Sequence, residues 1–181
     1  MAFGPDAELP IDKLLQPRAE AEIAFVLGAD LVDGPLDLAQ VRASVSYAVA
    51  ALEIVDSRIA GWEITLADTI ADNASSGFYV LGTERRTLAE FEPAKVEMKM
   101  FVDDKLVSTG DGTACLGDPL AALAWLARVA REFGEPLRAG QVVLSGALGP
   151  VHPVHPGARV TAHISGLGSV TARFSQRETR A

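Results

Sequence analysis

Residues 16–27 place the tightest constraint on how this chain can fold, because two carboxylates two residues apart lead directly into a solid apolar segment. The segment, QPRAEAEIAFVL, is typical of a buried strand, and Glu20 and Glu22 would then point to one face with their Cβ atoms roughly 7 Å apart. A hard cation that prefers oxygen ligands, Mg²⁺ or Mn²⁺, would balance these two like charges. Alternatively, both glutamates line the solvated face of a half-buried strand. The stretch by itself favours this second interpretation and leaves the first open.

Composition narrows the class of protein and its partners. The chain has 181 residues, 49% of them hydrophobic, which suffices for the core of a single domain spanning residues 1–181. A net charge of −8 argues against nucleic acid as a partner, because binding to polyphosphate depends on clustered Lys and Arg. The same acidity would repel an anionic substrate, so such a substrate would need a local cation.

Other features bear on cellular location. Cys115 is the single cysteine, which rules out an internal disulfide and a cysteine-rich zinc site. No run approaches the roughly twenty apolar residues that cross a bilayer, and the first six residues lack the pattern of a secretory signal. We therefore expect a cytoplasmic protein without a membrane association.

The order of the expected elements favours an α+β fold. Asp37 is placed to cap a helix of about fourteen residues whose apolar positions recur every three or four residues, and Asp118 and Pro119 open a second helix that ends before Gly134. The breadth of the second helix's apolar stripe, which includes Trp125, predicts that it packs between other elements. Alternation on both sides of Asp103 and Asp104 predicts a hairpin. The last third of the chain reads as strands and turns, so helices sit among hairpins rather than alternating with strands.

Most chemical motifs are weak. His152 and His155 have the wrong spacing for a helical zinc pair, and no serine lies in a nucleophile-elbow pattern. The glycine-containing turns lack the strand-turn-helix context of a dinucleotide site. The remaining candidates are a third carboxylate, Glu53, in a second apolar run, and polar groups that could line a site. These polar groups are Asn73, Ser75, Ser76, Ser145 and Gly146. The 73–76 cluster is equally typical of a tight turn, which is the interpretation we favour from the residues alone.

Four stretches together resemble one family. They are QPRAEAEIA at 16–24, LEIVDSRI at 52–59, DTIADNASSG at 68–77 and LSGALGP at 144–150. All four are similar to the 2-keto-4-pentenoate hydratases of the fumarylacetoacetate hydrolase superfamily, and the resemblance runs through essentially the whole chain. It implies a mixed, mainly antiparallel β-roll or barrel-like core with flanking helices.

The resemblance also implies a site and a reaction. Glu20, Glu22 and Glu53 would hold Mg²⁺ or Mn²⁺, and a 2-oxo acid would chelate that metal through its carboxylate and 2-oxygen. Ser145, Ser75 and Ser76 would be catalytic residues that line the pocket or orient water and the substrate. Asn73 and Gly146 would contact the substrate. The reaction implied is hydration of 2-hydroxypenta-2,4-dienoate to 4-hydroxy-2-oxopentanoate in meta-cleavage aromatic catabolism.

The chain departs from the family pattern at its start. Family members carry an earlier segment with a Lys-Ile-Gly-Leu-Thr-like motif and an acidic residue, and this sequence begins after those positions. We therefore expect either a truncated chain or one whose missing part is supplied elsewhere, with binding better supported than turnover. Two alternatives stay open: the sister 2-oxo-3-hexenedioate (4-oxalocrotonate) decarboxylase, and a non-catalytic subunit that binds a 2-oxo acid or a partner enzyme. A homo-oligomer is expected, and association with an aldolase or decarboxylase of the same pathway is a further hypothesis.

Overall fold

Two β-sheets packed against each other form the body of the protein. The structure is a computed structural model and describes residues 1–5 and 7–177. The first sheet has strand order β1-β5-β4-β3-β8, with β9 also paired to β3. Its strands are β1 (Ala2–Phe3), β3 (Arg18–Leu27), β4 (Val45–Val55), β5 (Ser76–Leu81), β8 (Val142–Leu144) and β9 (His152–Pro153). Only the β1–β5 pair is parallel among the pairings of this sheet in the described chain.

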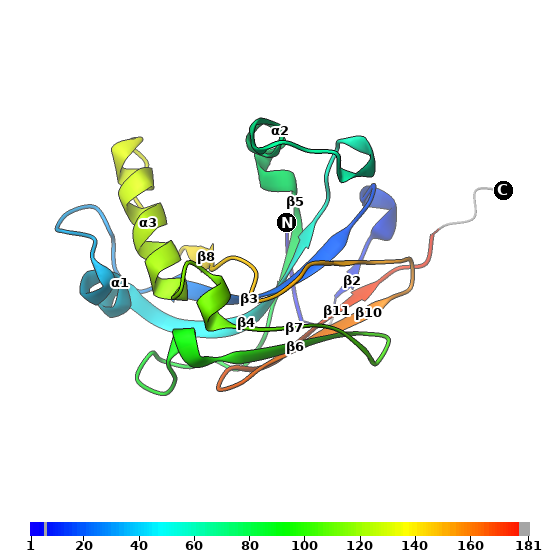
Figure 1. Cartoon of the computed structure of the whole chain (residues 1–181). Coiled ribbons are helices and arrows are strands. Elements are labelled where there is room, and N and C mark those ends of the chain that lie inside the picture. Colours follow the sequence, from blue (N-terminus) through cyan, green and yellow to red (C-terminus); the bar gives the residue numbers. More distant parts are fainter. Residues whose placement is uncertain (6, 178–181) are drawn as a thin grey trace.

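The second sheet has strand order β2-β11-β10-β6-β7. Its strands are β2 (Glu8–Leu9), β6 (Glu97–Val102), β7 (Lys105–Asp111), β10 (Arg159–Ile164) and β11 (Gly168–Phe174). Strands β10 and β11 lie against β4, and one continuous apolar core fills the space between the sheets. Figure 1 shows this second sheet beneath β3 and β4. The predicted α+β class is confirmed, and the described strands form two separate sheets rather than one closed barrel.

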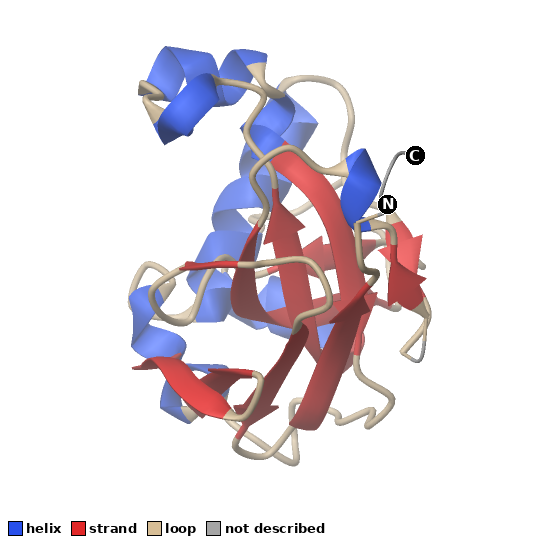
Figure 2. Cartoon of the chain, turned by 90° about the vertical axis from the view of Figure 1, so that its right-hand side faces the viewer, coloured by secondary structure: helices blue, strands red, loops and turns tan. Residues whose placement is uncertain are grey.

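The three α-helices lie at one side and at the top of the strands (Figure 2). They are α1 (Leu38–Ser44), α2 (Leu66–Ala71) and α3 (Pro119–Glu132). Short 3-10 turns occur at η1 (Ile11–Lys13), η2 (Ala60–Trp62), η3 (Asn73–Ser75), η4 (Pro93–Lys95) and η5 (Gly112–Ala114). No described helix has the length and apolar character needed to cross a bilayer.

The second predicted helix is confirmed at both ends. Asp118 caps α3 by accepting a hydrogen bond from the Leu120 backbone N–H at 2.8 Å, and Gly134 adopts a left-handed conformation (φ 82°) just past the end. The expectation that the whole stripe is packed is wrong at Trp125, whose surface is 54% exposed. The hairpin is also confirmed, with Asp103 and Asp104 forming its left-handed turn between β6 and β7.

The first predicted helix is correct only at its start. Asp37 accepts the backbone N–H of Gln40 as the helix cap, but α1 ends at Ser44 and strand β4 follows directly. Helical spacing of valines and leucine continues past residue 44, yet Val45, Val49 and Leu52 all pair with β3, and residues 51–55 of the same strand also pair with β5. Pairing on both edges outweighs the local pattern. The correction matters for function, because it places Glu53 on a strand beside β3.

Candidate metal centre

The strand register gathers the three candidate ligands. Glu20 of β3 lies directly opposite Glu53 of β4, and Glu22 lies two residues further along the same face of β3. One carboxylate oxygen from each of the three lies within 4.8 Å of the others. We call these residues the glutamate cluster. A one-residue slip of β4 would turn Glu53 into the core, so the apolar pattern of the opposite face maintains the cluster.

Burial makes this cluster electrostatically costly. Glu22 is 1% exposed, and its pKa is raised well above the ordinary value by burial and then by the Glu53 charge. Burial, and then the Glu53 charge, raises the pKa of Glu20 to about 7. Burial also raises the pKa of Glu53. Three carboxylates so close together cannot all be charged without a counter-charge, and an all-oxygen donor set suits a hard divalent cation. The residues therefore fit the metal that the resemblance implies.

Gly146 contacts the cluster through its backbone. Its N–H donates a hydrogen bond to Glu22 Oε2 at 2.8 Å, which orients the most buried carboxylate. The residue has a φ of 96°, a conformation that side-chain-bearing residues rarely adopt. A glycine at this position therefore allows the loop to turn its N–H toward Glu22.

Ser145 lies behind that loop rather than in the open part of the site. Its side chain accepts a hydrogen bond from the Ile23 N–H at 3.1 Å and donates one to the Gly146 carbonyl at 2.9 Å. The residue is 6% exposed. Both hydrogen-bonding functions of the hydroxyl are therefore used to attach the loop to β3, next to Glu22.

Cys115 completes this arrangement. Its Sγ lies 2.9 Å from the Gly146 carbonyl oxygen and 3.9 Å from Ser145 Oγ. Burial raises the pKa of the thiol to about 11, so it stays protonated and able to donate. The cysteine packs as a buried residue that is 6% exposed.

The polar cluster at 73–76 forms the predicted tight turn. Asn73, Ala74 and Ser75 all have positive φ, at 52°, 55° and 53°. Ser75 Oγ donates to Asp72 Oδ2 at 2.9 Å, and Ser76 Oγ donates to the Asn73 carbonyl at 2.7 Å. Within the described chain, no hydrogen bond joins these side chains to the glutamate cluster. The turn leads into β5, whose Tyr79 is the cross-strand neighbour of Glu53.

Sequence reasoning missed the group that supports the entrance of β3. Asp56 is 4% exposed, and its carboxylate accepts backbone N–H groups from Leu15 at 3.0 Å and Gln16 at 2.7 Å. Arg58, two residues later, pairs with Asp72 through a 2.7 Å contact from Nε to Oδ1. The position of Asp56 immediately after an apolar strand was the available signal, since a buried carboxylate there needs donors.

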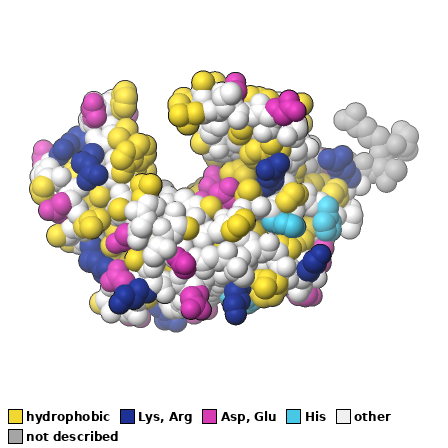
Figure 3. Space-filling model, in the orientation of Figure 1, with side chains coloured by type: hydrophobic (Ala, Val, Ile, Leu, Met, Phe, Trp, Pro, Cys, Tyr) yellow, Lys and Arg dark blue, Asp and Glu magenta, His cyan; other side chains and the backbone are white. Residues whose placement is uncertain are grey.

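The cluster faces a hollow between two walls. Figure 3 shows the surface recessed between α3 and the segment carrying α2, with acidic side chains near its base and apolar side chains on both walls. Leu66 and Ile70 of α2 are 78% and 72% exposed, and Phe133 at the end of α3 is 80% exposed. A cavity of about 490 Å³ is lined by Tyr47, Val49, Tyr79 and Leu81 among others, and none of the three glutamates is among its lining residues.

Comparisons with known proteins identify the family of the chain. The family model of the fumarylacetoacetate hydrolase C-terminal domain matches residues 2–175. The chain is 51% identical over 176 residues to the TodF product hydratase of Pseudomonas putida strain F1, covering 97% of this chain and 66% of that protein. It is 48% identical to the 2-keto-4-pentenoate hydratase of Paraburkholderia phymatum, covering 97% and 67% of the two chains.

Among solved structures, the 4-oxalocrotonate decarboxylase of Pseudomonas putida G7, complexed with magnesium and adipate, superposes with a TM-score of 0.90 at 34% identity. That match covers 96% of this chain and 66% of the decarboxylase. The chain thus spans about two thirds of the length of the relatives that it matches. On these matches, the chain belongs to the fumarylacetoacetate hydrolase superfamily and, within it, to the 2-keto-4-pentenoate hydratase family.

Proposed function

We propose that this chain carries the metal-binding core of a hydro-lyase that adds water to 2-hydroxypenta-2,4-dienoate to give 4-hydroxy-2-oxopentanoate. The observation that carries the proposal is the glutamate cluster, whose oxygens lie within 4.8 Å of one another. Support also comes from relatives at 47–51% identity that are named as hydratases. The substrate class is a small 2-oxo or 2-hydroxydienoic acid.

Glu20, Glu22 and Glu53 would hold Mg²⁺ or Mn²⁺. The related decarboxylase was solved with magnesium, which supports this choice of cation. When bound, the cation would supply Lewis-acid chemistry, neutralising the substrate carboxylate and polarising its 2-oxygen. The choice between the two metals is testable by titrating the protein with each.

The protein's own groups give the site its rigidity. The Gly146 N–H fixes one oxygen of Glu22, and Ser145 fastens the same loop to the backbone of β3. A carboxylate held in this way needs no rearrangement when its ligand arrives, which is the condition for pre-organised binding. In this proposal Ser145 acts by positioning Glu22. The turn that precedes Tyr79, the cross-strand neighbour of Glu53, is stabilised by hydrogen bonds of Ser75, Ser76 and Asn73.

A second candidate function is decarboxylation of 4-oxalocrotonate. It is favoured by the 0.90 TM-score to a structure of that enzyme, although the identity of 34% is lower than that to the hydratases. The two reactions begin with a similar 2-oxo acid and differ in the product released. A product assay therefore separates them.

The test is turnover by the full chain with Mg²⁺ or Mn²⁺. Loss of the dienoate absorbance with formation of 4-hydroxy-2-oxopentanoate, both abolished by EDTA, is the expected result. Glu53→Gln should remove activity, while the exposed Glu97 on the second sheet provides a matched control, Glu97→Gln. Release of CO₂ from 4-oxalocrotonate would instead support the second candidate. Metal binding without turnover of either substrate would contradict both and favour a binding subunit.

We further propose that residues 1–181 act as one domain in the cytoplasm.

We also propose that the chain assembles as a homo-oligomer. The apolar side chains exposed on α2 and at the end of α3 support an assembly that covers them. Light scattering coupled to size-exclusion chromatography tests the oligomer, and a monomer at micromolar concentration would contradict it. Association with an aldolase or decarboxylase of the same pathway can be tested by co-elution.

A further inference from the structure

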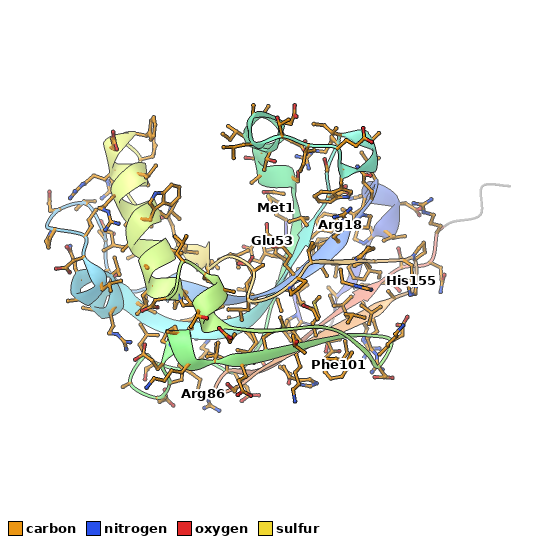
Figure 4. The ribbon with its side chains drawn as sticks, in the orientation of Figure 1. Met1, Arg18, Glu53, Arg86, Phe101 and His155 are labelled. Atoms are coloured by element: carbon orange, nitrogen blue, oxygen red, sulfur yellow. The ribbon has the colours of Figure 1, made fainter. Side chains whose placement is uncertain are left out.

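Arg18 is the only Lys or Arg in the described strands of the first sheet. It lies two residues before Glu20 on β3, so it shares the face that carries the glutamate cluster. Figure 4 shows Arg18 and Glu53 on the same side of the two strands. The Cα atoms of Arg18 and Glu20 are therefore one strand repeat, roughly 7 Å, apart.

The Arg18 guanidinium stacks on an aromatic ring. Its Cζ lies 4.3 Å from the centroid of the Trp62 ring. Five other arginines form ion pairs with carboxylates, namely Arg42, Arg58, Arg86, Arg138 and Arg159. Arg18 has no ion pair within the described residues, although it shares a strand face with Glu20 and Glu22. In a stacked arginine, one face of the planar guanidinium contacts the aromatic ring. The N–H groups at its edge remain free to donate hydrogen bonds to a planar anion.

Trp62 is held firmly in place beneath it. The indole Nε1–H donates to the Gln16 carbonyl at 3.0 Å, and the Gly61 N–H donates to Gln16 Oε1 at 3.1 Å. The Gln16 amide also donates to the Ser57 carbonyl at 2.9 Å. Trp62 itself has a φ of 60°, an uncommon conformation for a bulky residue that these bonds maintain. The loop is built to present its ring next to β3.

We propose that Arg18, stacked on Trp62, is an anion-binding subsite that receives a carboxylate of the 2-oxo acid held at the glutamate cluster. The inference rests on the proposed function, since it assumes a substrate of that class. In a protein of net charge −8, an anion needs positive charge placed locally. The Arg18 guanidinium supplies that charge. Because it stacks on Trp62 instead of forming an ion pair with Glu20, Glu20 stays available as a metal ligand.

The test measures binding of pyruvate, a simple 2-oxo acid, to the Mn²⁺-loaded full chain by isothermal titration calorimetry. Arg18→Gln should weaken pyruvate binding roughly tenfold to a hundredfold, because a charged hydrogen-bonding partner is lost. Arg18→Lys should lose less, since it keeps the charge and loses the forked geometry. Mn²⁺ affinity, measured separately, should change by no more than about twofold in either variant.

Arg85 provides the matched control. Its Cζ stacks 4.5 Å from the centroid of Tyr47, six residues from Glu53 on β4, so Arg85→Gln removes a stacked arginine away from the cluster. Pyruvate affinity should be unchanged in that variant. Trp62→Phe, which keeps an aromatic face, should retain most of the affinity.

Several outcomes would overturn the subsite. They are unchanged pyruvate affinity in Arg18→Gln, an equal loss in Arg85→Gln, loss of Mn²⁺ binding in Arg18→Gln, or no pyruvate binding by the unmodified protein. The proposed hydratase function fails separately: pyruvate and Mn²⁺ could bind as expected while the dienoate is not turned over. The calorimetric result decides the role of Arg18 in that case too.

Discussion

The two sheets share one core but treat their other faces differently. Along β6 and β10, buried and exposed residues alternate, so charged side chains such as Glu97 and Arg159 reach solvent. Strands β3 and β4 are largely buried on both faces, and the second face holds three carboxylates. The same residue type is thus ordinary on one sheet and costly on the other. A carboxylate that is buried at an energetic cost is therefore stronger evidence for a bound ligand than a carboxylate that is exposed to solvent.

The largest expected effect is on metal binding. Glu22→Gln removes the most buried charge of the cluster and should weaken Mn²⁺ binding by about 100-fold or more, the effect expected when a buried charge partner is lost. Calorimetric titration with Mn²⁺ measures the loss. Glu97→Gln on the second sheet should leave binding unchanged, and equal affinities for both variants would remove the distinction between the sheets.

The next effect is a dependence of stability on pH and metal. Since burial raises the pKa of Glu20 from 4.5 to about 7, its contribution to stability is present below pH 4.5 and is lost as the pH rises through 7. The metal-free protein should therefore lose up to about 3 kcal/mol of unfolding free energy across that range. Urea unfolding in EDTA at several pH values measures this loss, and saturating Mg²⁺ should reverse it. Stability that stays flat or rises between these pH values without metal would contradict the assignment.

A smaller effect separates two buried serines. Ser145→Ala leaves the Ile23 N–H without its side-chain acceptor and should cost about 1–3 kcal/mol. Ser108 on β7 is also buried, but its Oγ has no hydrogen-bond partner. Ser108→Ala should therefore be nearly neutral or stabilising, because no bond is lost. Chemical unfolding of both variants checks the order, and a larger cost at Ser108 would reverse the comparison.

The smallest effect is expected on the open face of the second sheet. The hydroxyls of Thr161 and Thr171 lie 3.0 Å apart across β10 and β11. Thr161→Val should lower the free energy of unfolding by at most about 1 kcal/mol, the range of a cross-strand pair, and should leave Mn²⁺ binding intact. Thermal unfolding measures the change in stability, and titration with Mn²⁺ measures the metal affinity. A loss of metal affinity here would mean that the two sheets are not independent in the way described.

The shared face of Glu20 and Glu22 was predictable from the sequence, because side-chain direction in a strand alternates with a period of two. The partnership of Glu20 with Glu53 depends on the register between β3 and β4, which only tertiary packing sets. Residues 45–52 were misassigned because valines at helical spacing are equally compatible with a strand buried on both faces. The position of Ser145 behind the loop could not be predicted, because its partners lie 122 residues away and one residue away.

Gly110 of β7 connects the second sheet to the loop that contacts the glutamate cluster. A Cβ atom at this position would lie 1.9 Å from the Leu148 carbonyl oxygen, in the loop that also carries Gly146. The backbone of β7 therefore limits how closely the 145–149 loop can pack against the second sheet. It thereby also fixes the position from which the Gly146 N–H donates its hydrogen bond to Glu22. Any side chain at residue 110 would have to push this loop away from β7, and with it the Gly146 N–H that hydrogen-bonds to Glu22.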